Sequence, residues 1–214
     1  ASLRAGITQL TNGNLRMMNG QELYDLFASA QNAGSIAFSR WKPELRNTNF
    51  DWWKFATRTG FTQDYNVMLQ GGSETLNSLF SLGYYDEKGA VKGFDCKRYS
   101  FRLKTNYQPL EWLTIRPSLS GAMQTSDDRQ HSVTSMYSML PWDKPYDDEG
   151  KPVPHKSPGW VNSNSTNYVY DLQWNHGDTR NYEFMGNLDF DVRIAPWLTF
   201  SSVNNYKYLH RAQH

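Results

Sequence analysis

From residue 61 onward, apolar and polar side chains alternate with a period of two, as in β-strands that have one apolar face. The clearest run places Tyr99, Phe101 and Leu103 on one face and Arg102 and Lys104 on the other. The periodicity predicts strands at about residues 61–70, 76–86, 97–108, 112–124, 181–194 and 197–209, with a weaker candidate at 2–9. A proline inside the 112–124 run, Pro117, predicts an irregular ladder there because proline has no N–H to donate.

The connections between these strands alternate in length. Residues 71–73, 108–111 and 195–196 are short turns, whereas 10–60 and 125–180 are long loops. Short turns at one end and long loops at the other are typical of outer-membrane barrels. The pattern therefore predicts an all-β fold: an antiparallel up-and-down meander that forms part of a transmembrane β-barrel.

The first long loop contains the two helices that the sequence predicts. Asn19 and Glu22 have the spacing of a capping box, which starts a helix over about 19–33, with Gly34 as its stop. A Thr48-x-x-Asp51 pair indicates a second helix over about 49–58. We expect helices to be confined to these two stretches.

Composition narrows the possible functions. The formal net charge is +1, so the chain lacks the basic surplus of a nucleic-acid-binding protein. Aromatic residues make up 15% of the chain, which argues against disorder, and the single cysteine excludes an internal disulfide. Two classes remain open: a membrane barrel, and a soluble β-rich module that binds glycans through its aromatic residues.

The loop 125–180 carries the best binding candidates because its aromatic residues lie among Pro, Asn, Ser and Gly. Aromatic faces stack on the C–H groups of sugars, and peptides use the same surfaces through apolar contact. The alternative is that these rings pack against each other, or against a partner protein, to order the loop. The candidate substrate-binding residues are Trp142, Tyr146, Trp160, Tyr168 and Trp174.

Catalytic and metal-binding patterns do not emerge from the sequence. It contains no Gly-x-Ser-x-Gly, phosphate loop or Cys-x-x-Cys, and its five histidines are scattered. The acidic stretch 143–149 matches no calcium loop and is interpreted as a solvated charge run. We therefore predict no enzyme activity, no catalytic residues, no metal site and no cofactor.

Residues 58–74 read RTGFTQDYNVMLQGGSE, and residues 81–99 read SLGYYDEKGAVKGFDCKRY. Together with MNGQELY at 18–24 and NTNFDW at 47–52, they resemble SusC/RagA-like TonB-dependent outer-membrane transporters of Bacteroidetes. The resemblance is strong over about 17–122. It implies an internal segment, the first barrel strands after the plug, with the plug domain and the remaining barrel strands absent from this chain.

The same resemblance implies a function and partners. Such transporters lie in the outer membrane and import oligosaccharides or peptides. They work with a SusD-like surface lipoprotein, and with TonB through a part of the transporter missing here. Outer-membrane lipid is then a further partner, and nucleic acid is not. In a barrel, Tyr99, Phe101 and Leu103 face lipid and Arg102 and Lys104 face a wet lumen, whereas a soluble sandwich buries the apolar face.

Overall fold

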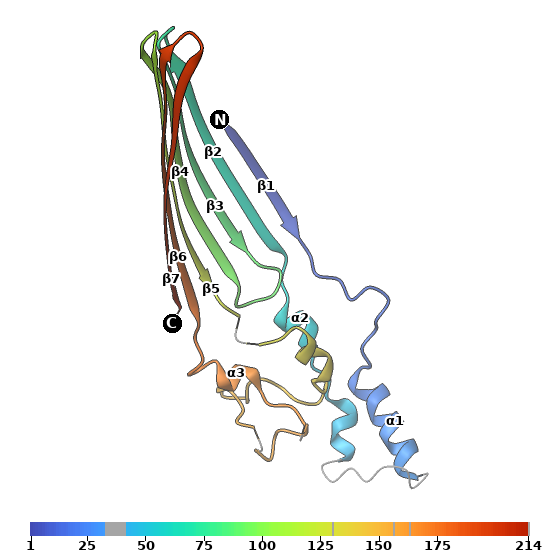
Figure 1. Cartoon of the computed structure of the whole chain (residues 1–214). Coiled ribbons are helices and arrows are strands. Elements are labelled where there is room, and N and C mark those ends of the chain that lie inside the picture. Colours follow the sequence, from blue (N-terminus) through green and yellow to red (C-terminus); the bar gives the residue numbers. More distant parts are fainter. Residues whose placement is uncertain (33–41, 130, 156, 163, 214) are drawn as a thin grey trace.

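The computed structural model describes residues 1–32, 42–129, 131–155, 157–162 and 164–213 (Figure 1). Seven strands form one antiparallel sheet in sequence order, so the predicted all-β meander is confirmed. The sheet is not closed within the described residues. The strands are β1 (Ser2–Thr8), β2 (Gly60–Gly72), β3 (Leu76–Lys88), β4 (Asp95–Leu110), β5 (Leu113–Asp127), β6 (Asp178–Ala195) and β7 (Leu198–Gln213).

Each strand expected from residue 61 onward is present, and most extend a few residues further at the loop end. The weak candidate at the N-terminus is β1, which pairs with β2. The irregularity expected at Pro117 is also present. The β4–β5 pairing passes from Lys104–Ser118 to Tyr107–Ile115 and skips Pro117, and the register then shifts before Leu110.

Register places the apolar side chains of neighbouring strands in rows on one face. One row runs through Tyr65, Tyr84, Tyr99, Met123 and Tyr182. The next row towards the hairpin turns contains Val67, Leu82, Phe101, Gly121 and Phe184. Most of these large side chains are exposed, because the described residues form a single sheet with no second sheet over this face.

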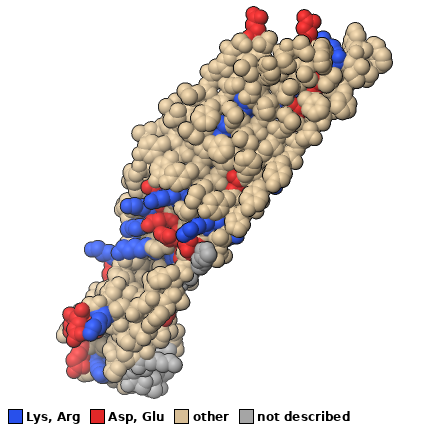
Figure 2. Space-filling model, turned by 90° about the vertical axis from the view of Figure 1, so that its left-hand side faces the viewer, with Lys and Arg blue, Asp and Glu red and all other residues tan. Residues whose placement is uncertain are grey.

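The opposite face of the sheet is polar. Arg102, Lys104 and Asp189 lie on it, and the Arg116 guanidinium pairs with the Asp191 carboxylate at 2.7 Å. On the apolar face, charged residues appear only beyond the tyrosine row, where Asp86 pairs in register with Lys97. Figure 2 shows charged residues gathered in a band near the loop end of the sheet, with few over the surface between that band and the hairpin turns.

The two long loops pack together at the end of the sheet opposite the short turns (Figure 1). We call the described residues of 9–59 and 128–177 the loop unit. Its helices are α1 (Gly20–Asn32), α2 (Trp52–Ala56) and α3 (Tyr168–Asp171), and its 3-10 turns are η1 (Pro43–Asn47) and η2 (Thr134–Ser138). No helix among the described residues is long and apolar enough to cross a membrane.

The capping box predicted for the first helix is confirmed. Asn19 Oδ1 accepts the Glu22 N–H at 2.8 Å, and a Glu22 carboxylate oxygen accepts the Asn19 N–H at 3.0 Å. The expected stop at Gly34 lies outside the described residues. The second helix, Trp52–Ala56, is shorter than predicted; it starts after Asp51, which caps it by accepting the Lys54 N–H at 2.9 Å, and its C-cap is Thr57.

The expectation that helices are confined to about 19–33 and 49–58 is corrected by η1, η2 and α3. All three are turns of four or five residues, too short for an apolar periodicity to reveal. The α3 turn starts where Asn167 Oδ1 accepts the Val169 N–H at 3.2 Å. Local capping, rather than an amphipathic pattern, therefore produces it.

Candidate binding site

The loop unit has an aromatic core of its own. Trp52, Met139 and Trp160 are buried together, with Phe50 and Tyr168 packed at the edge. The Trp52 and Trp160 rings meet edge-on, with centroids 6.0 Å apart. This core joins the first long loop to the second.

Buried polar side chains tie the core to the backbone around it. The Asp143 carboxylate, fully buried, accepts the N–H groups of Val161 and Asn162, so the expectation that the acidic stretch 143–149 is solvated is wrong for this residue. The Trp52 indole in turn donates to the Asp143 carbonyl at 3.0 Å. Asn167, equally buried, donates to two carbonyls, those of Pro145 and Val153, both at 2.8 Å. These bonds satisfy groups that would be costly to bury unpaired.

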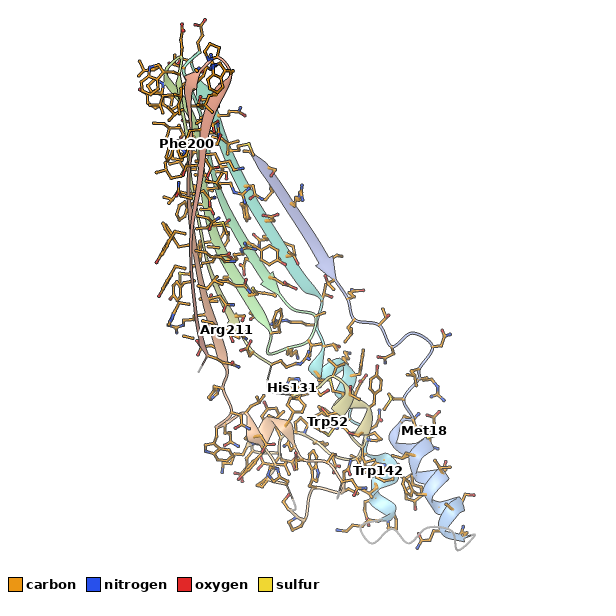
Figure 3. The ribbon with its side chains drawn as sticks, viewed as in Figure 1. Met18, Trp52, His131, Trp142, Phe200 and Arg211 are labelled. Carbon is orange, nitrogen blue, oxygen red and sulfur yellow. The ribbon has the colours of Figure 1, made fainter. Side chains whose placement is uncertain are left out.

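Two of the five predicted aromatic residues belong to this packed interior. Trp160 is 1% exposed and Trp142 is 3% exposed. The Trp142 indole donates to the Gly20 carbonyl at 3.0 Å and its ring packs on Phe27 of α1. Figure 3 shows Trp142 and Trp52 inside the loop unit. For these two rings, the placement matches the self-packing alternative.

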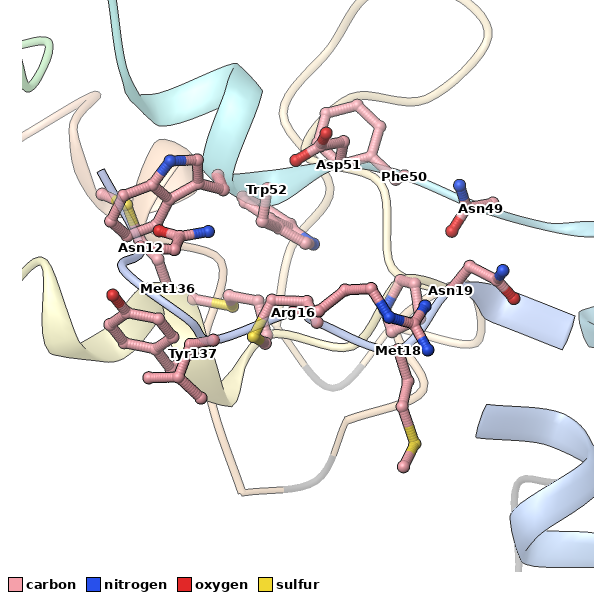
Figure 4. Close-up of a pocket in the computed structure, with 15 residues that line it drawn as sticks. Asn12, Arg16, Met18, Asn19, Asn49, Phe50, Asp51, Trp52, Met136 and Tyr137 are labelled. Atoms are coloured by element: carbon pink, nitrogen blue, oxygen red, sulfur yellow. The ribbon is translucent and has the colours of Figure 1, made fainter. Parts of the chain in front are cut away.

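A first cavity, of about 330 Å³, lies under the extended segment before α1 (Figure 4). Its walls are rich in methionine: Met17, Met18, Met136 and Met139. The rings of Trp53 and Tyr137 stand at one side, 5.3 Å apart. None of the five predicted aromatic residues lines this cavity.

A second cavity, of about 560 Å³, lies where the loop unit meets the ends of β5 and β6, and we call it the junction cavity. Phe55, Tyr146 and Tyr168 contribute its aromatic wall. Asp127 and Asp178 contribute carboxylates from the ends of the two strands. Its volume is within the range of small-molecule sites, and its mixture of apolar walls and a few polar groups is typical of them.

His131 stacks on Tyr168 in this cavity, with ring centroids 4.2 Å apart and planes 19° from parallel. Figure 3 shows His131 at the junction of sheet and loop unit. Burial, with a smaller contribution from the Arg129 charge, lowers the pKa of His131 to about 4. Burial and the neighbouring Tyr146 raise the pKa of Tyr168 to about 12. Both rings are therefore uncharged at neutral pH.

The charged groups of the junction cavity are unevenly balanced. Three carboxylates line it, those of Asp127, Asp128 and Asp178, against one ammonium, that of Lys92. Lys92 Nζ lies 5.3 Å from the centre of the Phe55 ring, a cation–π arrangement. The Asp128 carboxylate accepts the Thr179 hydroxyl at 2.5 Å. Carboxylates therefore outnumber ammonium groups on the lining, although the Asp178 carboxylate is paired with the Arg180 guanidinium at 3.1 Å.

Of the predicted residues, Tyr146 and Tyr168 are brought together at the junction cavity. Trp174 is 65% exposed outside it and packs edge-on against Tyr170. Substrate binding by any of the five stays a prediction. His131 and Lys92 could not be predicted from the sequence, since an isolated histidine and a lysine in a turn carry no local signal. Among the described residues, no group of three His, Cys, Asp or Glu side chains is placed to hold a metal ion.

The fold and the loop unit define a class: a segment of a β-barrel whose long loops gather at one end. No family model matches the chain. Over 211 residues it is 23% identical to the TonB-dependent receptor SusC of Bacteroides thetaiotaomicron. That match covers 86% of this chain and 20% of SusC.

Solved structures with the same fold include those of RagAB, described as a peptide importer or transporter. The "closed-closed" RagAB structure matches with a TM-score of 0.74 and 20% identity, over 99% of this chain and 28% of that one. A second RagAB structure matches with a TM-score of 0.73 and 21% identity, over 99% and 28% of the two chains. The "open-open" RagAB structure matches with a TM-score of 0.71 and 21% identity, over 99% of this chain and 27% of that one.

The resemblance read from the sequence motifs is thus confirmed: the chain is similar to SusC in sequence and to RagAB in fold. It spans between a fifth and just over a quarter of the length of these relatives.

Proposed function

We propose that this chain is part of the barrel of a TonB-dependent outer-membrane transporter. It would import oligosaccharides or peptides with a SusD-like lipoprotein over its long loops. The observation that carries the proposal is the seven-strand meander within a chain that matches a RagAB chain with a TM-score of 0.74, over 99% of this chain and 28% of that one. RagAB is described as a peptide importer and SusC as a TonB-dependent receptor.

The dimensions of the apolar face support a position in lipid. Tyr182 belongs to the tyrosine row, and Val192, ten residues further along β6, pairs with Leu113 close to the hairpin turns. Ten residues of strand extend about 33 Å, which a tilt of about 40° reduces to roughly 25 Å of membrane depth. That height equals the apolar band of outer-membrane barrels. Trp112 and Trp197, both exposed beside the short turns, then lie at the membrane–water interface on the side of those turns.

The loop lengths support an orientation. Barrels of this class have short turns on the periplasmic side and long loops on the extracellular side. The loop unit, with its junction cavity, would then face the substrate and the lipoprotein. TonB would act from the periplasmic side, through parts of the transporter outside residues 1–214.

The soluble glycan-binding module is the alternative from the sequence. A soluble sandwich would bury Tyr99, Leu103 and Phe184 under a second sheet, but all three are exposed on the single described sheet. This exposure favours the barrel.

The test is uptake and fractionation in the native host. A strain lacking this gene should lose uptake of a defined set of oligosaccharides or peptides, and the wild-type protein should fractionate with the outer membrane. Dissipating the proton gradient should stop the same uptake, because TonB-driven transport depends on it. A wild-type protein recovered in the soluble fraction, or uptake unchanged in the deletion strain, would contradict the proposal.

A further inference from the structure

Two lysines lie on the apolar face of the sheet just beyond the tyrosine row, and we call them the lysine pair. Lys97 is two residues from Tyr99 on β4, and Lys88 is four residues from Tyr84 on β3, so both point to the same face as the tyrosines. Both lysines are exposed, and neither forms an ion pair among the described residues.

The register makes the two lysines neighbours. Lys88 pairs with Asp95, and Lys97 lies two residues from Asp95 on the same strand, so the lysines are diagonal neighbours whose flexible side chains can reach one anion. The Asp95 carboxylate is paired with the Arg58 guanidinium, and Asp86, opposite Lys97, forms no ion pair with it. Three cations thus stand against two carboxylates on this part of the surface.

The neighbouring strands carry no such surplus on this face. On β5 and β6 the corresponding rows contain Asp127, Asp178 and Arg180. The Arg180 guanidinium is paired with the Asp178 carboxylate at 3.1 Å. The uncommitted positive charge is therefore confined to β3 and β4.

The height of the lysine pair corresponds to the headgroup layer of a membrane that covers the apolar face. Two and four residues of tilted strand place Lys97 about 5 Å and Lys88 about 10 Å outside the tyrosine row. Each headgroup layer of a bilayer extends about 5–8 Å beyond the hydrocarbon core. Lysine side chains at such a boundary reach anionic headgroups while their strands remain beside the acyl chains.

The two ends of the sheet differ in charge. The short turns at 71–75, 108–112 and 195–197 contain Glu74 and Glu111 and no lysine or arginine. Figure 2 shows acidic side chains projecting at the turn end, far from the charged band at the loop end. An outer membrane is asymmetric in the matching sense, because its outer leaflet consists of lipopolysaccharide, whose lipid A carries phosphate groups.

We propose that the lysine pair binds a lipid A phosphate of the outer leaflet, while the acyl chains of the same lipid pack on the apolar face below the tyrosine row. This inference rests on the proposed function, because that function places the face in the outer membrane. It adds a specific lipid site to the outer wall of the barrel, away from the lumen and from the loop unit.

The experiment measures lipid binding to the purified full-length transporter with its lipoprotein, in a nonionic detergent, by microscale thermophoresis. The probes are monophosphoryl lipid A, the same lipid A after removal of its phosphate, and inorganic phosphate. We expect the phosphorylated lipid to bind at least tenfold more tightly than the dephosphorylated one. Inorganic phosphate at the same concentration should not displace it, because the acyl chains contribute to binding.

Substitutions of the lysine pair test the site itself. Lys88→Gln and Lys97→Gln should each weaken binding of the phosphorylated lipid about fivefold, and the double variant roughly thirtyfold. Asp86→Asn removes the nearby carboxylate and should strengthen binding. The matched control is Lys104→Gln, on the same strand as Lys97 but on the opposite face, which should leave lipid binding unchanged.

The inference is overturned if both forms of lipid A bind equally, if inorganic phosphate displaces the lipid, or if the double variant binds like the wild type. An equal loss in Lys104→Gln would also overturn it, because overall charge would then explain the effect. Its failure is distinguishable from that of the proposed function. A double variant that reaches the outer membrane and keeps its lipid refutes only the lipid site, whereas a wild-type protein absent from that membrane refutes the transporter.

Discussion

Gly20 shows how a single residue can hold the loop unit together. Its N–H donates to Asn49 Oδ1 at 2.9 Å, and its carbonyl accepts the Trp142 indole N–H at 3.0 Å. A Cβ at this position would lie 1.8 Å from the Thr48 carbonyl oxygen, so the residue has no room for a side chain. The backbone at Thr48 and Asn49 can therefore pack against the start of α1 only because this position is glycine.

We expect Gly20→Ala to destabilise the loop unit by about 1–3 kcal/mol, because the backbone of Thr48 has to move to admit the methyl group. In hydrogen-exchange measurements, the backbone amides of α1 and those around Trp142 should exchange faster, while the exchange rates of the strands should not change. The control is Gly159→Ala in the same unit, where a Cβ meets nothing within 4 Å. Equal hydrogen-exchange protection of the loop unit in Gly20→Ala and Gly159→Ala would contradict the close packing at Gly20.

The stack of His131 on Tyr168 makes the loop unit sensitive to acid. The pKa of His131 is about 4 in the folded protein and about 6.5 when solvated, so the unfolded state binds more protons between these values. Stability should therefore fall as the pH drops from about 6.5 to about 4, with no further loss from this residue below that. His131→Phe removes the titrating group and should flatten this part of the pH profile. Tryptophan fluorescence during denaturation measures this stability at each pH. If His131→Phe shows the same pH profile as the wild type, the burial of His131 is contradicted.

Among the secondary-structure elements, the strands are those that the sequence reveals best. Alternation predicts them because each has one apolar and one polar face, as in β4, where Phe101 and Arg102 point to opposite sides. The α3 turn cannot be predicted from periodicity because a local cap, Asn167, produces it, and η2 has no side-chain cap and is too short to show a periodicity. The junction cavity cannot be predicted from the sequence for a related reason. It requires α3, the strand ends and the β3–β4 turn to meet, and only tertiary packing brings His131 onto Tyr168.

The second long loop is the element whose removal separates barrel assembly from function. Replacing residues 130–175 by a short Gly-Ser linker leaves the β5–β6 ladder intact up to the Asp127–Asp178 pair. It removes Trp160 and two of the three rings of the aromatic wall of the junction cavity, those of Tyr146 and Tyr168. We expect normal assembly in the outer membrane but weaker uptake or weaker association with the lipoprotein, measured by co-purification. Replacing only the exposed turn at 147–150 is the matched control. Normal uptake and complex formation after the larger deletion would exclude this loop from the mechanism.

At the scale of the whole molecule, two structural parts depend on different surroundings. The loop unit has its own aromatic core around Trp52 and Trp160, and the buried side chains of Asp143 and Asn167 find their hydrogen-bond partners within the unit. The sheet has no such core: its apolar face is exposed, and the outer edges of β1 and β7 pair with no described strand. Because unpaired strand edges are not tolerated in lipid, the sheet is stable there only when further strands close the barrel.

This difference predicts how residues 1–214 behave when they are produced alone. In water the sheet exposes a continuous surface of Tyr, Phe and Leu side chains, including Tyr99, Leu103 and Leu188, where soluble monomers tolerate patches of only about a few hundred Å². Its two open edges also offer templates for intermolecular pairing. The charges of Arg102 and Asp189 do not shield this surface, because they lie on the opposite face. We therefore expect 1–214 to be insoluble or to depend on detergent, as measured by size-exclusion chromatography and thermal melting with and without detergent. A monodisperse monomer that melts cooperatively in detergent-free buffer would contradict the barrel and favour the soluble glycan-binding module.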